Sequence, residues 1–315
     1  MELIFDSMVV IFLSIILEAL PFVLIGVMAS SLIHLFVSDD FIKRVLPKNR
    51  FLRILAAGMM GIFFPICECG IVLVVRRLIQ KGVPLSTGIA FMLAVPIINP
   101  VVAASTHLAF PHFPMLYYRM GGAFIIAVLI GLILELFYSK NPKDYIRENK
   151  MPQAACGCSH TPVIQLELKK KKTGVFANII VRGEELLSHA TQDLFVMGRF
   201  LLIGSFIASF IQTVVSRDIL VSIGTGQGSS IAVMMGLAHI LSICSEADAF
   251  VAKSFSATFI PASLTAFLLY GPMADIKNTL MMLACFKGKF VALLFAMITF
   301  FVFLLTYLQA VYLGV

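Results

Sequence analysis

The sequence predicts an all-α membrane protein with two inverted repeats, about six transmembrane helices and two re-entrant, broken helical hairpins. Three observations predict this fold class. Apolar residues make up 60% and charged residues 13% of the 315 residues, and the mean hydropathy is +0.99. Average soluble domains carry roughly 25% charged residues, so a soluble enzyme is excluded, as are a disordered chain and a disulfide scaffold. The other two observations are apolar runs of membrane-spanning length and a likeness between the two halves of the chain.

The apolar runs are of two kinds, continuous and interrupted. A helix needs about 20 apolar residues to cross the hydrocarbon core of a bilayer. The runs 54–80 and 229–255 are interrupted by helix-breaking and polar residues. Limbs of about 11 residues reach only about half of the hydrocarbon thickness, so both interrupted runs are expected to form re-entrant hairpins. The six continuous runs, expected to cross fully, are 8–37, 86–110, 116–138, 191–215, 256–280 and 287–312.

The basic residues favour this topology. If both hairpins return to the side from which they enter, 20 of the 24 Lys and Arg residues fall in loops on one face. Because Lys and Arg concentrate in cytoplasmic loops, this face is expected to be cytoplasmic, with both termini outside. The net charge of +7 is then a loop bias, and no nucleic-acid partner is expected because aromatic residues are not interleaved with the bases. The four loops are 38–53, 76–82, 139–190 and 276–289.

The two halves of the chain resemble each other at an offset near 178 residues. At this offset Gly26 matches Gly204, and Glu68 falls on Glu246. Each half is expected to hold three crossings and one hairpin. An odd number of crossings predicts inverted repeats with a site near the membrane midplane, as in many secondary transporters. The predicted division is a first transmembrane repeat, a cytoplasmic basic loop and a second transmembrane repeat, at 1–138, 139–190 and 191–315.

The interruption of the first hairpin, Pro65-Ile66-Cys67-Glu68-Cys69-Gly70, carries the most chemistry. Pro and Gly break the helix, and an ionisable Glu inside a membrane is costly and usually functional. Two thiols in a Cys-x-Cys spacing suit a thiophilic ion such as zinc, copper(I) or a trivalent arsenical. The two cysteines and the Glu are therefore candidate substrate and metal ligands. In the alternative interpretation the cysteines only pack, and the Glu pairs with Arg76 or Arg77.

The second hairpin is interrupted at Cys244-Ser245-Glu246-Ala247-Asp248. Cys244 adds a third thiol, and Glu246 and Asp248 add carboxylates that are able to hold a cation or exchange protons. Cys244 and Glu246 are candidate metal ligands together with the first tip, and Asp248 is a candidate transport residue. The alternative is an internal pairing of these acids with Lys253.

Asn99 and Asp275 each follow a proline by three residues, and these prolines, Pro96 and Pro272, align in the repeat after a two-residue slip. Proline removes the hydrogen bond to the carbonyl four residues earlier. Each broken span is therefore expected to offer oxygens and a polar side chain at mid-depth, which makes Asn99 and Asp275 candidate transport residues. The alternative is a simple kink packed against a neighbouring helix.

The basic loop contains Cys156-Gly157-Cys158-Ser159-His160. Cys156, Cys158 and His160 offer two thiolates and an imidazole, with no fourth ligand nearby, which suits capture or hand-over of a metal more than a structural zinc site. The alternative is a pair of reactive thiols on a flexible linker. No resident cofactor is expected apart from transported or bound zinc or another soft metal. No nucleotide-binding or catalytic motif is present, so we do not expect an enzyme.

These motifs resemble the predicted permeases of the YraQ/ArsP type, especially the YcgR-like branch. The resemblance implies a permease of the inner or plasma membrane. It also implies a small partner membrane protein and, from members with an assigned substrate, binding of methylated trivalent arsenicals by the paired cysteines of the first tip. Members of the family more often read Cys-Ser-Cys-Gly there, so Glu68 is a departure that favours a dication such as zinc. The resemblance is carried by Pro65 to Gly70, Val95 to Pro100, Ile243 to Ala252 and Gly271-Pro272.

Three functions stay open. The favoured one is a permease that moves a thiophilic metal or metalloid, a zinc-like dication or a trivalent arsenical, through a midplane Cys/Glu site in the lipid bilayer. The second is a permease for a small organic anion or amphiphile in which the thiols are incidental. The third is a membrane thiol redox protein, although the two Cys-x-Cys pairs are predicted to lie at different depths. The sequence predicts no particular oligomeric state.

Overall fold

The computed structural model describes residues 2–36, 47, 49–63, 67–112, 114–138, 145, 175–214 and 226–313. These residues form helices and no β-strand, so the predicted all-α class is confirmed. The first half contains α1 (Glu2–Phe36), α3 (Arg50–Met59), the short 3-10 helix η1 (Met60–Phe63), α4 (Glu68–Gln80), α5 (Leu85–Ala94), α6 (Pro100–Ala109) and α7 (Met115–Phe137). The second half contains α8 (Val175–Val214), α10 (Gln227–Leu241), α11 (Asp248–Ser254), α12 (Pro261–Ala274), α13 (Ile276–Cys285) and α14 (Gly288–Leu313).

Three stretches among the described residues are long and apolar enough to cross a membrane: Asp6–Leu32 in α1, Met115–Phe137 in α7 and Gly288–Tyr312 in α14. Helix α8 begins at Val175, inside the segment that the charge pattern assigns to the basic loop. Exposed apolar side chains such as Leu17 of α1, which is 68% exposed, are expected where a helix faces lipid rather than water.

Two of the predicted continuous crossings, 86–110 and 256–280, are each divided between two helices. Helix α5 ends at Ala94, just before Pro96, and α12 ends at Ala274, two residues after Pro272. Proline lacks the N–H that helix continuation requires. The chain is therefore interrupted near the two prolines as well as at the two predicted tips.

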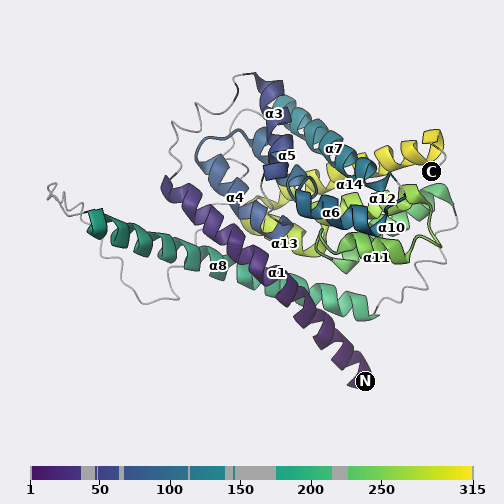
Figure 1. Ribbon diagram of the computed structural model, residues 1–315, viewed down its shortest axis with the longest axis horizontal. Helices are drawn as coiled ribbons and strands as arrows, with labels where there is room; N and C mark the ends of the chain where they lie inside the picture. Colours follow the sequence, from purple (N-terminus) through teal and green to yellow (C-terminus); the bar gives the residue numbers. More distant parts are fainter. Residues whose placement is uncertain are drawn as a thin grey trace.

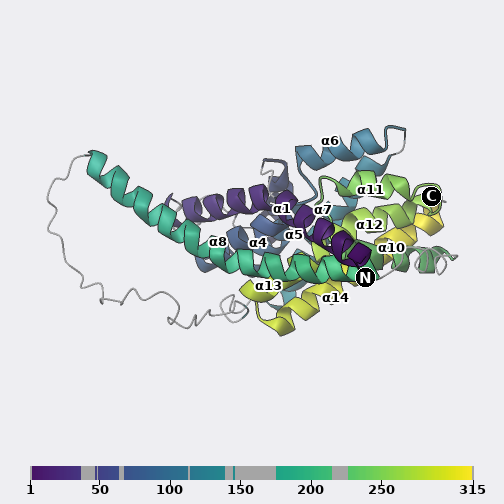
Figure 2. The ribbon, with the colours of Figure 1, turned by 90° about the horizontal axis from the view of Figure 1, so that it is seen from below.

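The helices follow the same order in both halves. A long helix (α1 or α8) is followed by helices on either side of a tip (α3 and α4, or α10 and α11). Next come two helices flanking a proline break (α5 and α6, or α12 and α13) and a long final helix (α7 or α14). Helices α1 and α8 pack side by side across one face of the other helices (Figure 1). Figure 2 shows that the N-terminal end of α8 extends well past the rest of the bundle.

The tips and the proline breaks of opposite halves meet inside the bundle. Helix α4, which follows the first tip, packs against α13, which follows the second proline break. Helix α11, which follows the second tip, packs in turn against α6, which follows the first proline break. This reciprocal arrangement places residues of both halves at one centre.

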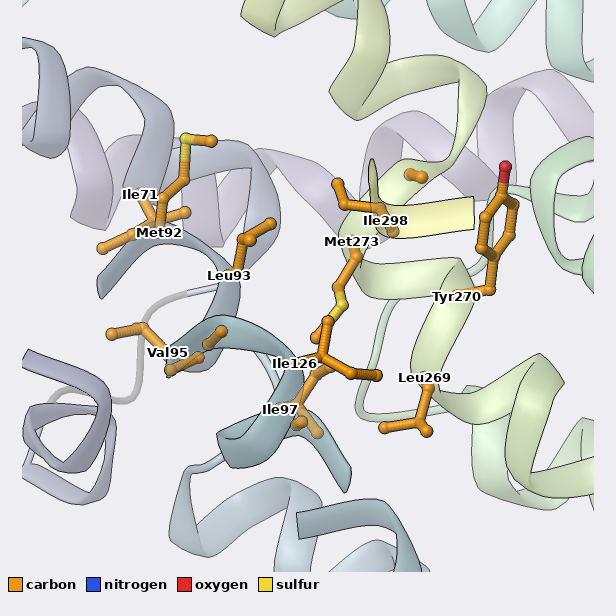
Figure 3. Packing of buried hydrophobic residues seen from close by; sticks show 14 of the residues in the cluster. Ile71, Met92, Leu93, Val95, Ile97, Ile126, Leu269, Tyr270, Met273 and Ile298 are labelled. Atoms are coloured by element: carbon orange, nitrogen blue, oxygen red, sulfur yellow. The ribbon is translucent and has the colours of Figure 1, made fainter. Parts of the chain in front are cut away.

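One cluster of buried apolar side chains surrounds this centre. It joins Ile71 of α4 and Met92 of α5 to Leu269 of α12 and Ile298 of α14 (Figure 3). The cluster continues into the cysteines of both tips. The tip cysteines are therefore buried in protein, which is one of the two surroundings, with a water-filled cavity, in which irregular backbone is tolerated at membrane depth.

Two glycines bring the long helices close to this centre. A Cβ atom placed on Gly26 of α1 would lie 2.4 Å from the Cα atom of Gly70, so the backbones of α1 and α4 touch at this crossing. A Cβ atom on Gly204 of α8, the repeat counterpart of Gly26, would lie 3.2 Å from the Cα atom of Lys277 in α13. Small residues commonly permit such close crossings between membrane helices.

Candidate substrate site at the helix breaks

Three thiols from the two tips lie together in the core. Cys67 occupies the position before the first residue of α4, Cys69 lies in the first turn of that helix, and Cys244 lies between α10 and α11. Their exposed fractions are 0%, 1% and 1%, and the Cys67 thiol interacts with the thiols of both Cys69 and Cys244. The structure thus brings together the three cysteines that the sequence singles out at the tips.

Glu68, the first residue of α4, faces Lys277, which the sequence analysis assigns to a cytoplasmic loop. Its carboxylate is fully buried; Oε2 accepts a hydrogen bond of 3.4 Å from the Ser245 hydroxyl, and Oε1 lies 4.0 Å from the Nζ atom of Lys277. The predicted loop 276–289 includes Lys277, but this side chain is only 1% exposed and lies inside the core. That assignment was wrong, because α13 begins directly after the proline break and carries Lys277 inward.

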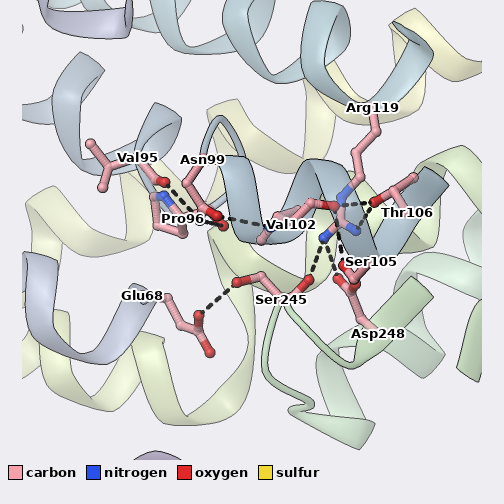
Figure 4. A network of polar contacts seen from close by, with 10 residues as sticks. All are labelled: Glu68, Val95, Pro96, Asn99, Val102, Ser105, Thr106, Arg119, Ser245 and Asp248. Atoms are coloured by element: carbon pink, nitrogen blue, oxygen red, sulfur yellow. Dashed lines mark hydrogen bonds and ion pairs between the residues drawn. The ribbon is translucent and has the colours of Figure 1, made fainter. Parts of the chain in front are cut away.

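Asp248, the first residue of α11, is held by a second buried base. The Arg119 guanidinium of α7 donates to the Asp248 carboxylate at 2.7 Å, to the Ser245 carbonyl at 2.9 Å and to the Thr106 hydroxyl at 2.8 Å (Figure 4). Charge-assisted hydrogen bonds of this length are the strong ones. The alternative of a pairing with Lys253 is not what the structure has, since the Lys253 ammonium lies over the Phe110 ring, 5.1 Å from its centroid.

Asp275 and the two half-buried acids complete the charged groups at the centre. Asp275 Oδ2 lies 3.8 Å from Lys277 Nζ. Glu246 and Glu18 are only partly buried, and the charge of Glu246 interacts with those of Glu68 and Glu18. The fully buried acids are therefore paired with bases, whereas Glu246 and Glu18 lie toward the surface of the same region.

The polar residues after the prolines turn out to cap helices. Asn99 Oδ1 accepts from the Val102 N–H at 2.8 Å and caps α6, while Asp275 Oδ1 accepts from the Asn278 N–H at 2.6 Å and caps α13. The Asn99 amide also donates to the Val95 and Pro96 carbonyls. In the second break the Asn278 amide donates to the carbonyls of Pro272 and Met273.

These hydrogen bonds matter for the predicted role of the breaks. Four carbonyls at the breaks, those of Val95, Pro96, Pro272 and Met273, already accept from a side chain of the same break and need no ion there. The kink alternative describes Asn99 well. Asp275 keeps one oxygen, Oδ2, that is buried and has no hydrogen-bond partner.

The positions of the acids in the two tip helices differ from the match that the sequence offset gives. Glu68 is the first residue of α4 and Asp248 is the first residue of α11. The structural counterpart of Glu68 is therefore Asp248, whereas the sequence offset pairs Glu68 with Glu246. The difference of two residues runs opposite to the slip between the two prolines, because Asp248 follows Glu68 by 180 residues whereas Pro272 follows Pro96 by 176.

The two predicted ligand sets, at the tips and in the basic loop, differ in how much of each the structure describes. Among the described residues, no group of three or more His, Cys, Asp and Glu side chains is arranged to hold a metal ion. Cys156, Cys158 and His160 lie outside the described residues, as do Pro65 and Ile66 of the first tip. The metal-ligand assignments stay predictions.

Sequence reasoning missed the two buried bases, Arg119 and Lys277. Arg119 lies within the predicted crossing 116–138, and an arginine inside a crossing is itself a signal of a functional or paired group. For Lys277 the signal was weaker, because it depends on where α13 begins. The proline three residues before Asp275 is the only local indication.

Comparison with known proteins identifies the family of the chain. A family model described as "Predicted permease", ArsP_1, matches residues 4–311. The UPF0718 protein YcgR of Bacillus subtilis is 46% identical over 285 residues, which is 90% of each chain. A putative two-component membrane permease complex subunit of Streptococcus mutans is 43% identical over 282 residues, 89% of this chain and 87% of that one. No solved structure matches. The chain therefore belongs to the ArsP_1 family of predicted permeases.

Proposed function

We propose that the protein is a multi-pass permease that moves a thiophilic metal or metalloid species through the centre formed by Cys67, Cys69 and Cys244. The observation that carries the proposal is the meeting of these three thiols. They come from both halves, are buried, and lie where α4 and α13 of opposite halves pack. Thiolates are the ligands that soft metals and trivalent arsenicals prefer.

The charges around the thiols bear on the substrate class. The negative charge of Glu68 favours a zinc-like dication. The positive charge of Lys277, 4.0 Å away, offsets it. A neutral trivalent arsenical, which binds thiols without bringing charge into the core, is therefore as well supported as a dication. The half-buried Glu18 and Glu246 line the same region and suit an entry path for either.

The reciprocal packing of the two halves supports two inverted repeats, with six crossings and two hairpins in a cell membrane. In this proposal the basic loop 139–190 is cytoplasmic and both termini lie outside. The relative from Streptococcus mutans is named a subunit of a two-component permease complex, which supports a small partner membrane protein for this chain too. The protein is proposed to act as a transporter and not as an enzyme.

Labelling with phenylarsine oxide tests the thiol site. Each reagent molecule forms two As–S bonds with two thiols and releases one water. In a background with Cys156→Ser and Cys158→Ser, the folded protein is expected to take up one arsenic per chain, measured by intact mass and by elemental analysis. Cys67→Ser with Cys69→Ser is expected to abolish this uptake. Cys285→Ser is the matched control, because Cys285 is also fully buried but lies at the far end of α13.

Transport is measured in proteoliposomes with the same variants, as arsenic or zinc retained in the vesicles. Loss of transport in the Cys67/Cys69 double variant, with normal transport in Cys285→Ser, is the expected outcome. Unchanged transport and unchanged binding in the double variant would contradict the proposal.

A second candidate, a permease for a small organic anion, is favoured by one observation. The N-terminal ends of α4, α11 and α13 carry positive partial charge, and they lie beside the buried bases Arg119 and Lys277. This candidate predicts that transport of the anion persists when all three tip cysteines are serine.

A further inference from the structure

Lys277 is placed where a positive charge is least favourable. It is the second residue of α13, and its exposed fraction is 1%. The N-terminal end of a helix repels a cation, and burial removes the ammonium from water. Positions that break local rules in this way are often functional, so the contacts of Lys277 need an explanation beyond stability.

The ion pair between Arg119 and Asp248, in the same core, gives a comparison for the contacts of Lys277. Its guanidinium makes hydrogen bonds of 2.7 to 2.9 Å to Asp248, Ser245 and Thr106. The carboxylate oxygens near Lys277, in contrast, lie 3.8 and 4.0 Å from Nζ, beyond the usual N–H···O range. Lys277 is therefore attracted by the charges around it without being fixed by short hydrogen bonds.

Each oxygen that faces Lys277 lies within 4.0 Å of its ammonium but accepts no hydrogen bond. Glu68 Oε1 and Asp275 Oδ2 are buried and make no hydrogen bond, and they are the two atoms nearest to the ammonium. The thiols of Cys69 and Cys244 are buried in the cluster at the same centre. Carboxylate oxygens and thiols are a ligand set that borderline divalent cations such as zinc and cadmium accept.

We propose that Lys277 is a tethered counter-cation: its ammonium fills the position at which Glu68 and Asp275 would hold a free divalent cation, which binds only by displacing it. A neutral thiophile reacts with the thiols without displacing the ammonium. Lys277 therefore sets the preference of the site between neutral and cationic thiophiles. The thiol part rests on the proposed function, whereas the carboxylate part rests on Glu68 and Asp275 alone.

Cadmium binding to the full-length protein in lipid nanodiscs tests this proposal. Equilibrium dialysis with elemental analysis gives the affinity, and phenylarsine oxide labelling gives the reactivity of the thiols. Lys277→Met is expected to bind Cd²⁺ at least about ten-fold more tightly than the unaltered protein and to keep the same phenylarsine oxide stoichiometry. Lys277→Gln serves as a second variant, because its amide can donate to the same oxygens and preserve folding without the charge.

Two control variants separate local displacement from a general effect of charge. Lys253→Met removes a positive charge from the same half, where the lysine lies over an aromatic ring, and is expected to leave Cd²⁺ affinity unchanged. Asp275→Asn in the Lys277→Met background removes one proposed ligand and is expected to cancel the gain.

The outcomes are distinct. Unchanged Cd²⁺ affinity in a folded Lys277→Met or Lys277→Gln protein would overturn the proposal, as would a gain that persists after Asp275→Asn. If the Cd²⁺ gain appears but phenylarsine oxide does not label Cys67 and Cys69, the proposed function fails while the role of Lys277 stands.

Discussion

At the residue scale, the buried acids that open the two tip helices are each matched by a base from the other half. Glu68 faces Lys277, and Asp248 is bound by Arg119. The sequence was enough to place the acids and cysteines near a centre, because a carboxylate or thiol beside a helix break is visible locally. It was not enough to place the bases, since a pairing between residues 119 and 248 depends on how the halves pack.

Removing Arg119 alone is expected to destabilise the protein strongly. Arg119→Met leaves Asp248 buried without its counter-charge, and breaking such a pair from one side costs about 3–5 kcal/mol. Replacing both partners, as Arg119→Met with Asp248→Leu, is expected to recover most of that loss because no charge stays buried. Thermal unfolding in detergent measures the cycle. A double variant no more stable than Arg119→Met would show that the pair is not the source of the stability.

At the element scale, interruptions and close crossings position the site. The tips and the proline breaks were predictable because Pro, Gly and buried polar residues end helices by local chemistry. The sequence predicts broken spans at Pro96 and Pro272 but counts 86–110 and 256–280 as one crossing each, because hydropathy does not show that a separate helix follows each break. The use of Asn99 and Asp275 as helix caps follows the usual preference for these residue types at that position.

The crossing of α1 over α4 gives a sharp test. Alanine normally favours a helix interior over glycine by about 1 kcal/mol, but at Gly26 the added Cβ would meet the backbone of Gly70 at 2.4 Å. Gly26→Ala is therefore expected to lower the unfolding temperature and to weaken phenylarsine oxide labelling of the adjoining tip. Gly121→Ala in α7 is the matched control, because nothing lies within 4 Å of its added Cβ; we expect it to be neutral or slightly stabilising. Equal effects of the two changes would rule out the crossing as the cause.

At the scale of the whole molecule, the repeated order of helices was predictable from the offset between the halves, at which Gly26 matches Gly204, although the first residues of the tip helices, Glu68 and Asp248, are two residues out of that register. The reciprocal meeting of α4 with α13 and of α11 with α6 was not, since nothing in a single sequence states which faces of two repeats come together. The membrane topology stays a prediction that rests on the distribution of Lys and Arg.

Single cysteines introduced at the two termini and in the segment 139–190 test that topology. In a background lacking the native cysteines, a membrane-impermeant maleimide added to intact cells is expected to label both termini. The segment 139–190 is expected to label only after permeabilisation. Labelling of just one terminus would mean an odd number of crossings and would exclude the arrangement of six crossings with two hairpins.

The ion pairs between the two halves also constrain how the protein folds during its synthesis. The ribosome completes α4 and α7 long before it reaches α11 and α13, so Glu68 and Arg119 enter the membrane before either of their partners exists. An unmatched charge in hydrocarbon is costly, and the first half cannot reach its final packing while it waits. We expect the nascent first half to stay close to the water-filled insertion machinery, and to settle only when the segment carrying Lys277 emerges. A gene fragment that encodes one half alone should then yield a product that the cell degrades.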